Sequence, residues 1–377
     1  MNLDHLYDDQ LDALAIAEFR TLKASFSGSR LWEAEKLLGH GSFGFTALLR
    51  DKSLLRGRSQ RKYVLKRSLV PHRGTDDITN EIGGLELLRG STHLVNIIAS
   101  TGDVAEYRKK KNSGSVVRRA MKRLKRTWDN PPTNVFKVLS ISEGPAMLLE
   151  YIPNGSLLDL MNRANRRGYS IPNRILWSFY LCLVRACVGM AYPLKRPAGE
   201  PQVLEEILRG VEPFGAMHND VALRNIMVDE TEIIPEHYLI PKLKLIDFGI
   251  AEESESAQHA IRENLWDITR EMISIIKRRG VDLRDGNWGV YNGVSTYAVD
   301  VLPRNGVNPF PTLDPELRLL LVEAMALGFA ERPSLRQMLR RTRDGAAKPA
   351  AAYHQRALDE SDMVIKMHMQ QLLYDAA

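Results

Sequence analysis

The chain has 377 residues, a hydrophobic fraction of 44%, a charged fraction of 26% and a formal net charge of +6. Its length exceeds the usual size of one hydrophobic core, so we expect two packed lobes with extensions. The composition is that of soluble globular proteins and excludes wholesale disorder. Residues 108–126 hold ten Lys and Arg and no acid, and subtracting those ten charges from +6 leaves −4 for the remainder. The basic character is therefore local to one segment.

The sequence predicts an intracellular protein, cytoplasmic and/or nuclear, without an integral membrane segment. Its first residues are acidic at the start and lack the basic region and cleavage site of a secretory signal. The longest apolar run, residues 175–192, is interrupted by Arg185 before it reaches the length of a bilayer span. The only cysteines, Cys182 and Cys187, lie in that run on different faces of the expected helix, which favours packed thiols in a reducing compartment.

In chain order, residues 1–30 are expected to form a helical lead-in. Residues 31–51 alternate apolar and other residues around a glycine cluster, which is typical of strand, turn and strand, and the following RKYVLKRSLV predicts a third strand. A helix is predicted over 77–89, where apolar residues recur at helical spacing. The run AMLLEYI indicates a short buried strand that enters a turn at 153–155.

Beyond that turn the helical period dominates. The predicted helices span residues 156–165, 175–192, 263–278, 315–341 and 361–375, with loop-like insertions at 193–212 and 229–241. A strand-rich front and a helix-rich back predict an α+β fold of two lobes with a cleft between them. The predicted domains are a helical extension (1–30), a first lobe (31–152) with a basic insertion (about 105–133), a second lobe (153–342), and a C-terminal linker and helix (343–377).

A glycine-rich string opens the candidate site. It fits GxGxxG, a pattern in which missing side chains let backbone amides approach phosphate oxygens. A flexible hairpin turn accounts for the same string equally well when it stands alone. Its candidate phosphate-binding residues are Gly39, Gly41, Ser42, Phe43 and Gly44.

A lysine and a glutamate follow the glycine string. Lys66 lies on the predicted third strand, and Glu81 begins the apolar stripe of the following helix, from which its carboxylate could reach inward to Lys66. Glu86 is the competing choice, but it falls on another face of that helix. A solvated surface position is the alternative interpretation for each of these residues.

The most specific motif is MHNDVALRNIMV, in which His218, Asp220 and Asn225 fit H-x-D-x-x-x-x-N. Asp220 would accept or orient the proton of an attacking hydroxyl, and Asn225 would hold a magnesium ion. His218 is interpreted as a packed scaffold residue. Downstream, an apolar strand ends in Asp247-Phe248-Gly249, where the aspartate is the second candidate metal ligand.

These motifs, in this order, resemble those of the eukaryotic protein kinase superfamily across roughly residues 31–342. The resemblance implies ATP and Mg²⁺ as cofactors, a small antiparallel sheet lobe that carries the helix called αC, and a larger, mainly helical lobe. It implies that Lys66, held by Glu81, pairs with the α- and β-phosphates, and that Asp247 chelates magnesium. Arg224 supplies a cation near the γ-phosphate, as in tyrosine-kinase catalytic loops.

The resemblance also places the adenine. Leu149 corresponds to the gatekeeper at the start of the hinge, and the backbone groups of two hinge residues face the base. The implied nucleotide contacts are the backbones of Glu150 and Ile152, Ser156 near the ribose, and Val64 and Met227 on the two faces of the ring.

The sequence departs from the family pattern at several points. Asn219 replaces the arginine that in many kinases binds a phosphorylated activation loop. No APE motif follows Gly249, and the next helical segment contains Asp267, the expected anchor of the catalytic loop. Thr46 replaces a valine that usually lies over the adenine. We therefore expect activity that is independent of loop phosphorylation, and a rebuilt platform for the phosphate acceptor.

Three functions remain open from the sequence. The first is a serine/threonine-type protein kinase, preferred on family base rates although Arg224 favours tyrosine; its protein substrate is unknown. The second is a small-molecule phosphotransferase of the choline or aminoglycoside type, favoured by the missing APE motif and opposed by Phe43 in the glycine loop. The third is a kinase-like scaffold that binds ATP without turnover, which the intact set of polar motif residues opposes.

The basic insertion carries a separate prediction. Val117, Met121, Leu124 and Trp128 recur on one side of a possible helix whose remainder is cationic. Such a helix would bind anionic lipid, a calmodulin-like groove or a nuclear import receptor. A solvated loop between strands is the alternative.

Overall fold

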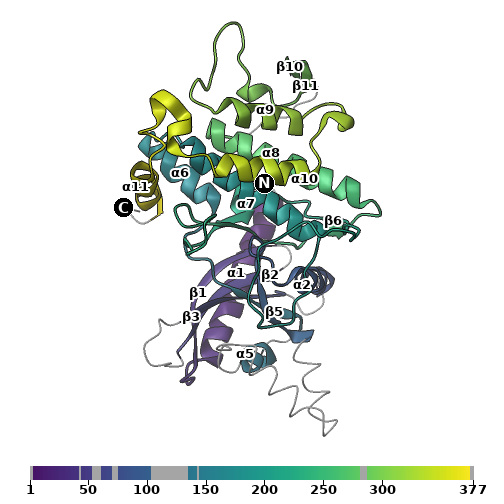
Figure 1. Cartoon of the computed structure of the whole chain (residues 1–377). Helices are drawn as coiled ribbons and strands as arrows, with labels where there is room; N and C mark the ends of the chain where they lie inside the picture. Colours follow the sequence, from purple (N-terminus) through teal and green to yellow (C-terminus); the bar gives the residue numbers. More distant parts are fainter. Residues whose placement is uncertain are drawn as a thin grey trace.

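The computed structural model describes residues 3–41, 44–52, 61–69, 75–102, 135–141, 144–280 and 287–373. Ser42, Phe43 and the whole basic insertion lie outside these residues. The described chain is a mixed α+β structure whose first part is rich in strands and whose second part is mainly helical (Figure 1).

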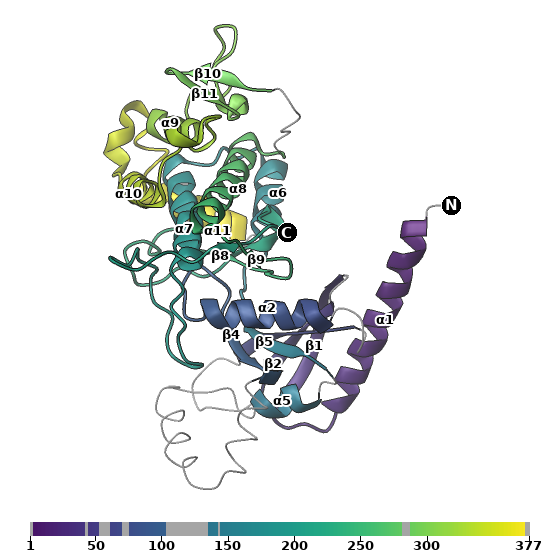
Figure 2. The ribbon, with the colours of Figure 1, turned by 90° about the vertical axis from the view of Figure 1, so that its right-hand side faces the viewer.

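The strand-rich part is built on a five-stranded antiparallel sheet of order β1-β2-β3-β5-β4. Its strands are β1 (Trp32–Gly41), β2 (Gly44–Asp51), β3 (Arg61–Arg67), β4 (Ile97–Ser100) and β5 (Ala146–Glu150). The long lead-in helix α1 (Leu3–Ser25) runs beside the sheet, and α2 (Thr75–Leu88) lies between the sheet and the helical part (Figure 2). The short α5 (Val135–Ile141) precedes β5.

The helical part contains α6 (Leu157–Arg167), α7 (Asn173–Ala191), α8 (Ala257–Lys277), α9 (Pro315–Ala324), α10 (Leu335–Ala346) and α11 (Asp362–Leu373). Three short strand pairs stiffen its loops. They are β6 (Ala216–Met217) with β9 (Glu252–Glu253), β7 (Ile226–Val228) with β8 (Leu243–Leu245), and β10 (Gly289–Tyr291) with β11 (Val294–Thr296).

Side-chain caps explain several helix boundaries. Ser156 and Asp159 form a capping box at the start of α6, and Ser334 and Gln337 form another at α10. Ser256 caps α8, which therefore begins six residues earlier than the predicted 263. The predicted helix 315–341 is wrong as one element, because a 3₁₀ turn (Phe329–Glu331) and a proline before Ser334 separate α9 from α10.

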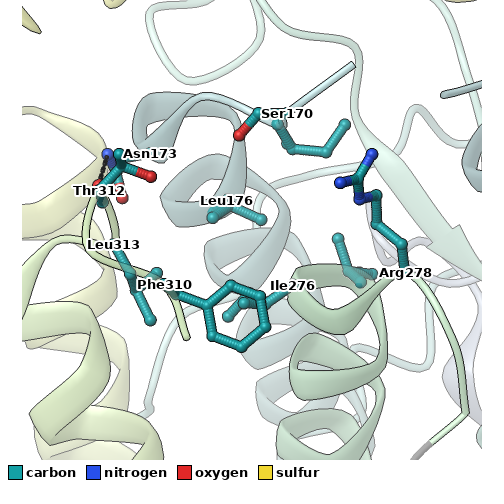
Figure 3. A pocket seen from close by; sticks show the side chains of 10 residues that line it. Ser170, Asn173, Leu176, Ile276, Arg278, Phe310, Thr312 and Leu313 are labelled. Atoms are coloured by element: carbon teal, nitrogen blue, oxygen red, sulfur yellow. Dashed lines mark hydrogen bonds between the residues drawn. The ribbon is translucent and has the colours of Figure 1, made fainter. Parts of the chain in front are cut away.

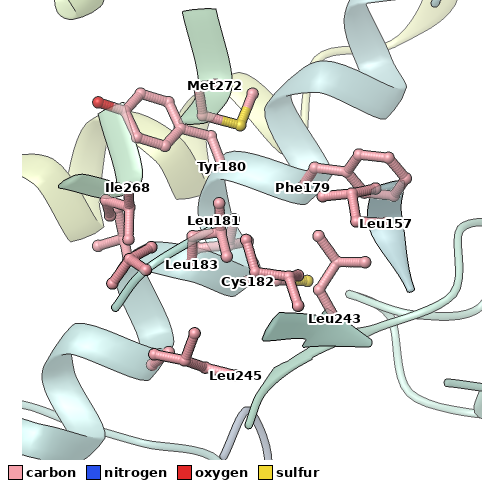
Figure 4. Close-up of a cluster of buried hydrophobic side chains, with 14 of the residues drawn as sticks. Leu157, Phe179, Tyr180, Leu181, Cys182, Leu183, Leu243, Leu245, Ile268 and Met272 are labelled. Atoms are coloured by element: carbon pink, nitrogen blue, oxygen red, sulfur yellow. The ribbon is translucent and has the colours of Figure 1, made fainter. Parts of the chain in front are cut away.

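Helix α7 is the centre of the helical core. It packs against α8, α10 and β8, and nearly every one of its residues is buried. Figure 4 shows part of this core, with residues 179–183 of α7 in one cluster with Leu243 of β8 and Met272 of α8. Among the described residues it is the helix that is long and apolar enough to cross a membrane, but 89% of its apolar window lies inside the protein. Its hydropathy is therefore that of a core helix.

The two cysteines of α7 lie in different surroundings. Both are free and buried, as expected. Burial raises the pKa of the Cys187 thiol, in keeping with a packed side chain. Burial also opposes ionisation of Cys182, but His237 and His93 outweigh it and hold the pKa of that thiol at about 6. Cys182 therefore has two polar neighbours, His93 and His237.

The insertions at 193–212 and 229–241 contain no described helix, but they are not peripheral. Glu205 and His237, one from each insertion, are 1% exposed, and Gln202 donates to the carbonyl of Ser91 at 2.9 Å. Both insertions therefore pack into the core beside α7.

Candidate active site

Three motif residues that are far apart in the sequence meet at Lys66. Its Nζ lies 2.8 Å from Glu81 Oε1 on α2 and 2.7 Å from Asp247 Oδ1, which follows β8. Burial would lower the pKa of Lys66, but the Glu81 and Asp247 carboxylates outweigh it and raise that pKa above its ordinary value. Lys66 is therefore a fixed cation at the end of β3. Glu86, the competing choice, accepts a hydrogen bond from Ser100 instead.

The backbone around Asp247 is held in a conformation that non-glycine residues seldom adopt. Asp247 has φ 65°, and Asn219 in the preceding loop has φ 62°. Next to Asp247, Phe248 is buried and its ring meets the His218 ring edge-on, with centroids 4.6 Å apart. These contacts aim the Asp247 carboxylate, which is 42% exposed, toward Lys66 and solvent.

Asp220 is oriented by the two polar residues that follow it in the motif. Asn225 Nδ2 donates to Asp220 Oδ2 at 2.8 Å, and Arg224 Nη2 lies 2.5 Å from Asp220 Oδ1. Burial lowers the pKa of His218, whose Nδ1 accepts from the Asp220 backbone at 3.2 Å and whose Nε2 lies 3.0 Å from the carbonyl of Ile246. His218 is thus a neutral residue that joins the loop of Asp220 to the segment before Asp247. This agrees with its interpretation from the sequence as a packed scaffold residue.

The strand pair β7–β8 joins the two candidate metal ligands. Asn225 directly precedes β7, and the backbone N–H of Ile246, just before Asp247, donates to the carbonyl of Asn225 at 2.9 Å. Because Asn225 Nδ2 is bonded to Asp220, the amide oxygen is the atom left for a cation. An amide oxygen and a carboxylate are ligands that suit Mg²⁺. The residues present therefore fit the ion that the motifs imply.

The anchor of the catalytic loop differs from the prediction. Asn264, one turn before Asp267 on α8, accepts from the His218 backbone at 3.1 Å and donates to the carbonyl of Ala216 at 2.7 Å. Asp267 instead pairs with Arg270 at 3.1 Å, and Arg270 donates to the carbonyl of Val221 at 3.0 Å. The prediction of Asp267 failed because helical spacing alone did not tell which turn of α8 faces the loop.

The glycine string forms the β1–β2 hairpin. A Cβ on Gly44 would lie 2.2 Å from the carbonyl oxygen of Arg67 on β3, so only glycine fits there. Thr46 donates its hydroxyl to the carbonyl of Gly39 at 3.1 Å, which ties the two strands together. Gly41 ends β1 and pairs with Gly44, and His40 bonds with Asp12 of α1. Ser42 and Phe43 fall outside the described residues.

The predicted adenine-side residues line adjacent strands and the connection to α6. Val64 on β3 is in register with Leu149 on β5, and Ile152 is buried just after that strand. Glu150 turns its carboxylate away to Lys244 Nζ, at 2.6 Å. Ser156 pairs with Met227 through an isolated β-bridge.

The Ser156 hydroxyl has a structural role in addition to the ribose contact predicted from the sequence. It accepts from the backbone of Asp159 at 3.1 Å and donates to the Asp159 carboxylate at 2.7 Å, as the cap of α6. A contact between Ser156 and the ribose stays a prediction.

Two pockets differ in whether the motif residues line them. An open groove of about 600 Å³ lies beside Asp220 and Arg224 and is lined from α8 by Asp267, Arg270 and Glu271. The cavity in Figure 3, of about 70 Å³, lies between α7, α8 and residues 310–313 and shares no lining residue with the motifs. Of these two pockets, the groove is therefore the one that adjoins Asp220.

No protein-family model matches the chain. A curated relative, the tyrosine-protein kinase csk-1 of Caenorhabditis elegans, is 22% identical to it over 213 residues. The match indicates a distant relationship between this chain and protein kinases. The match covers 52% of this chain and 33% of the relative, so the chain spans about a third of the length of that kinase.

Proposed function

We propose that the chain is an ATP-dependent phosphotransferase of the protein-kinase type, with the nucleotide between a strand-rich lobe and a helical lobe. The observation that carries this proposal is Lys66 Nζ held between Glu81 and Asp247, at 2.8 and 2.7 Å. A surface lysine on a strand would not be placed between carboxylates from two other elements. The distant similarity to a kinase supports the same interpretation.

The proposed mechanism assigns each polar residue one task. Lys66 binds the α- and β-phosphates, and Glu81 keeps its ammonium in place when the nucleotide arrives. Asn225 and Asp247 would hold Mg²⁺, which neutralises phosphate charge as it develops. Asp220 orients the acceptor hydroxyl and takes its proton, and Arg224 adds a positive charge beside the transferred group.

The acceptor that we propose is a protein hydroxyl group. The prediction of serine or threonine rested on base rates and gains no support, because the relative is named as a tyrosine kinase. Arg224 at the fourth position after Asp220 also favours tyrosine, and the open groove beside it leaves room for a larger side chain. The experiment must therefore distinguish phosphate on tyrosine from phosphate on serine or threonine. A small-molecule acceptor and a catalytically silent scaffold remain the competing functions.

The test is phosphotransfer from labelled ATP, with and without magnesium, to mixed protein and metabolite acceptors, followed by phosphoamino-acid analysis. We expect label on protein that requires magnesium. Label on a metabolite alone would replace the protein acceptor, and ATP binding without any transfer would favour the scaffold.

Two variants test the residue assignments. Asp247→Asn and Lys66→Met should each lower turnover by at least about 100-fold, because a charge that compensates the phosphates is lost. Matched controls are Asp344→Asn, an exposed aspartate on α10, and Lys62→Met, which lies on the same strand as Lys66 with a side chain 41% exposed. Wild-type turnover in Asp247→Asn at saturating magnesium would exclude the metal assignment.

A further inference from the structure

Three buried side chains with metal-binding atoms meet outside the candidate active site. His93 lies between α2 and β4, Cys182 on α7, and His237 in the insertion 229–241. One ligand atom from each lies within 4.8 Å of the other two, and the three residues are at most 1% exposed. No local sequence signal marks this cluster, because its members are separated by 89 and 55 positions, much farther apart than the ligands of a compact metal motif.

A fourth residue fixes the orientation of His93. Glu205 Oε2 lies 2.7 Å from His93 Nδ1, and Glu205 Oε1 accepts from the His93 backbone at 2.6 Å. An ionised carboxylate only accepts hydrogen bonds, so Nδ1 carries a proton, and Nε2 is the ring nitrogen that faces His237. A carboxylate behind a histidine in this way is the usual support for a histidine that binds a metal.

The spacing inside the cluster is close to that around a tetrahedral ion. His93 Nε2 and His237 Nε2 are 3.0 Å apart. A zinc ion with Zn–N bonds of about 2.0–2.1 Å holds two nitrogens roughly 3.3 Å apart. The two nitrogens are therefore within a few tenths of an ångström of that separation, and the Cys182 sulfur lies within 4.8 Å of both histidines.

The ligand atoms of the cluster also suit Zn²⁺. One cysteine sulfur and two imidazole nitrogens are ligands that Zn²⁺ prefers, and they are a poor match to Mg²⁺, which prefers oxygen.

We propose that His93, Cys182 and His237 bind a structural Zn²⁺ ion, with Glu205 as the supporting carboxylate and a water in the fourth position. The ion would tie both insertions to α7. It would also fix the segment that begins at His93, whose carbonyl accepts from the Leu245 backbone at 2.9 Å. This site is separate from the phosphotransfer residues, so its test does not depend on phosphotransfer.

The first experiment measures the metal content of the purified full chain after equilibration with Zn²⁺ and removal of the free metal. We expect about one zinc per chain in the wild type and none in Cys182→Ala. Cys187→Ala is the matched control: it removes a buried thiol from the same helix, outside the cluster, and should keep the zinc. A metal-free wild type, or equal zinc in both variants, would overturn the proposal in favour of a histidine pair joined by a hydrogen bond.

The second experiment does not require a ligand variant to fold. Removing the metal from the wild type with a chelator should lower Tm, and adding Zn²⁺ alone should restore it. Co²⁺ should give a sulfur-to-cobalt absorption band, and Glu205→Gln should weaken Co²⁺ binding by about 10- to 100-fold while keeping that band. An unchanged Tm after chelation together with no such band would overturn the proposal.

Discussion

Asn264 shows how a single buried amide can hold a catalytic loop. Its side chain is 3% exposed and bonds to the loop backbone at both Ala216 and His218. Those residues lead directly into Asp220. The position of the Asp220 carboxylate, which accepts the proton in the proposed mechanism, therefore depends on a residue of α8 that does not contact substrate in that mechanism.

Asn264→Ala should lower kcat by about 100-fold, because displacement of a catalytic group by roughly 1 Å has a cost of that order. The two lost hydrogen bonds should also cost about 1–3 kcal/mol of unfolding free energy. Steady-state kinetics and urea unfolding check both effects. Asn165→Ala, which removes an exposed bond to the carbonyl of Arg278, is the control and should leave kcat unchanged. Unaltered kcat in Asn264→Ala would mean that other bonds, such as that from Arg270 to the Val221 carbonyl, hold the loop without Asn264.

Among single residues, the sequence analysis found those that belong to recognisable motifs, namely Lys66, Glu81, Asp220, Asn225 and Asp247. The structure brings Lys66, Glu81 and Asp247 into contact, and it joins Asp220 to Asn225. The sequence could not predict Asn264 or the cluster around His93. Their partners come from separate elements, and a single asparagine or histidine carries no spacing that marks a partner.

The segment after Gly249 is short and is held by hydrogen bonds between neutral groups. Asn219 Nδ2 donates to the carbonyl of Ile250 at 3.2 Å, and the Ser254 backbone donates to the carbonyl of Gly215 at 2.8 Å. Strand β9 within it pairs with β6. A Cβ on Gly215 would lie 2.3 Å from the Ser254 oxygen, so this close approach requires glycine.

We therefore expect phosphotransfer that does not depend on phosphorylation of this segment. The Asn219 side chain already bonds to the Ile250 carbonyl, and an uncharged amide cannot form the bidentate, charge-assisted hydrogen bonds that a guanidinium forms with a phosphate. The test compares untreated protein, phosphatase-treated protein and Ser254→Ala/Ser256→Asn, all at equal concentration. Asparagine is chosen at 256 because it retains a cap for α8 and cannot be phosphorylated. Equal rates support the prediction, whereas a loss on phosphatase treatment contradicts it.

Asp314 joins three elements through one carboxylate. It caps α9 by accepting from the Glu316 backbone at 2.9 Å, and its other oxygen accepts from Trp177 Nε1 at 2.8 Å and Lys348 Nζ at 2.7 Å. Burial would raise the pKa of Asp314, but the bonds from Lys348 and Trp177 outweigh it and lower that pKa.

Asp314→Ala should cost about 2–4 kcal/mol of unfolding free energy, from the lost cap and an unpaired buried indole N–H. A lowered folded pKa means that the contribution of Asp314 is complete above the unfolded value of about 3.9 and is lost as pH falls below it. Urea unfolding at neutral pH and near pH 3 should show the difference from wild type shrinking in acid. Glu316→Ala, an exposed change in the same turn, should cost less than about 1 kcal/mol. A difference that does not change with pH would contradict the ionic part of this account.

Among the elements, the sequence predicted those with strong periodicity and missed boundaries that depend on caps. The early start of α8 follows from Ser256, and the break between α9 and α10 follows from a 3₁₀ turn and Pro333. The apolar residues on both sides of that break face one core, so their spacing concealed it.

For the whole molecule, α1 is part of the folded structure and is not a loose extension. Leu22 is 2% exposed and belongs to the same apolar cluster as Trp32, Phe45 and Leu65 of the sheet. Glu18 also pairs with Arg67 on β3. The helix therefore covers apolar surface that the sheet would otherwise expose.

Leu22→Ala should cost about 2–5 kcal/mol of unfolding free energy, because it leaves a cavity between α1 and the sheet. Ile16→Ala, on the same helix at 44% exposure, should change stability by less than about 0.5 kcal/mol. Denaturant unfolding of both variants measures the contrast. Equal small effects would show that α1 is dispensable.

The predicted mixture of a strand-rich front and a helix-rich back is confirmed at the level of an α+β structure. The predicted boundary at 152/153 stays a prediction. Met147 and Leu149 of β5, with most of the apolar stripe of α2, belong to the same buried cluster as α7, and a separate cluster lies between α1 and the other side of the sheet. Composition could not reveal this, because it does not say which face of a sheet meets which helix.

The central position of α7 has a consequence for synthesis of the chain. Its covering helices α8 and α10 are encoded downstream, and at about 5–20 residues per second the roughly 150 residues from the end of α7 to the end of α10 need on the order of 10–30 s. During that interval the 19-residue apolar helix α7 lacks the two helices that pack against it in the finished fold. Apolar surface that is exposed during synthesis promotes aggregation, so we expect the yield of folded protein in cells to depend on chaperone supply as well as on the stability of the finished fold.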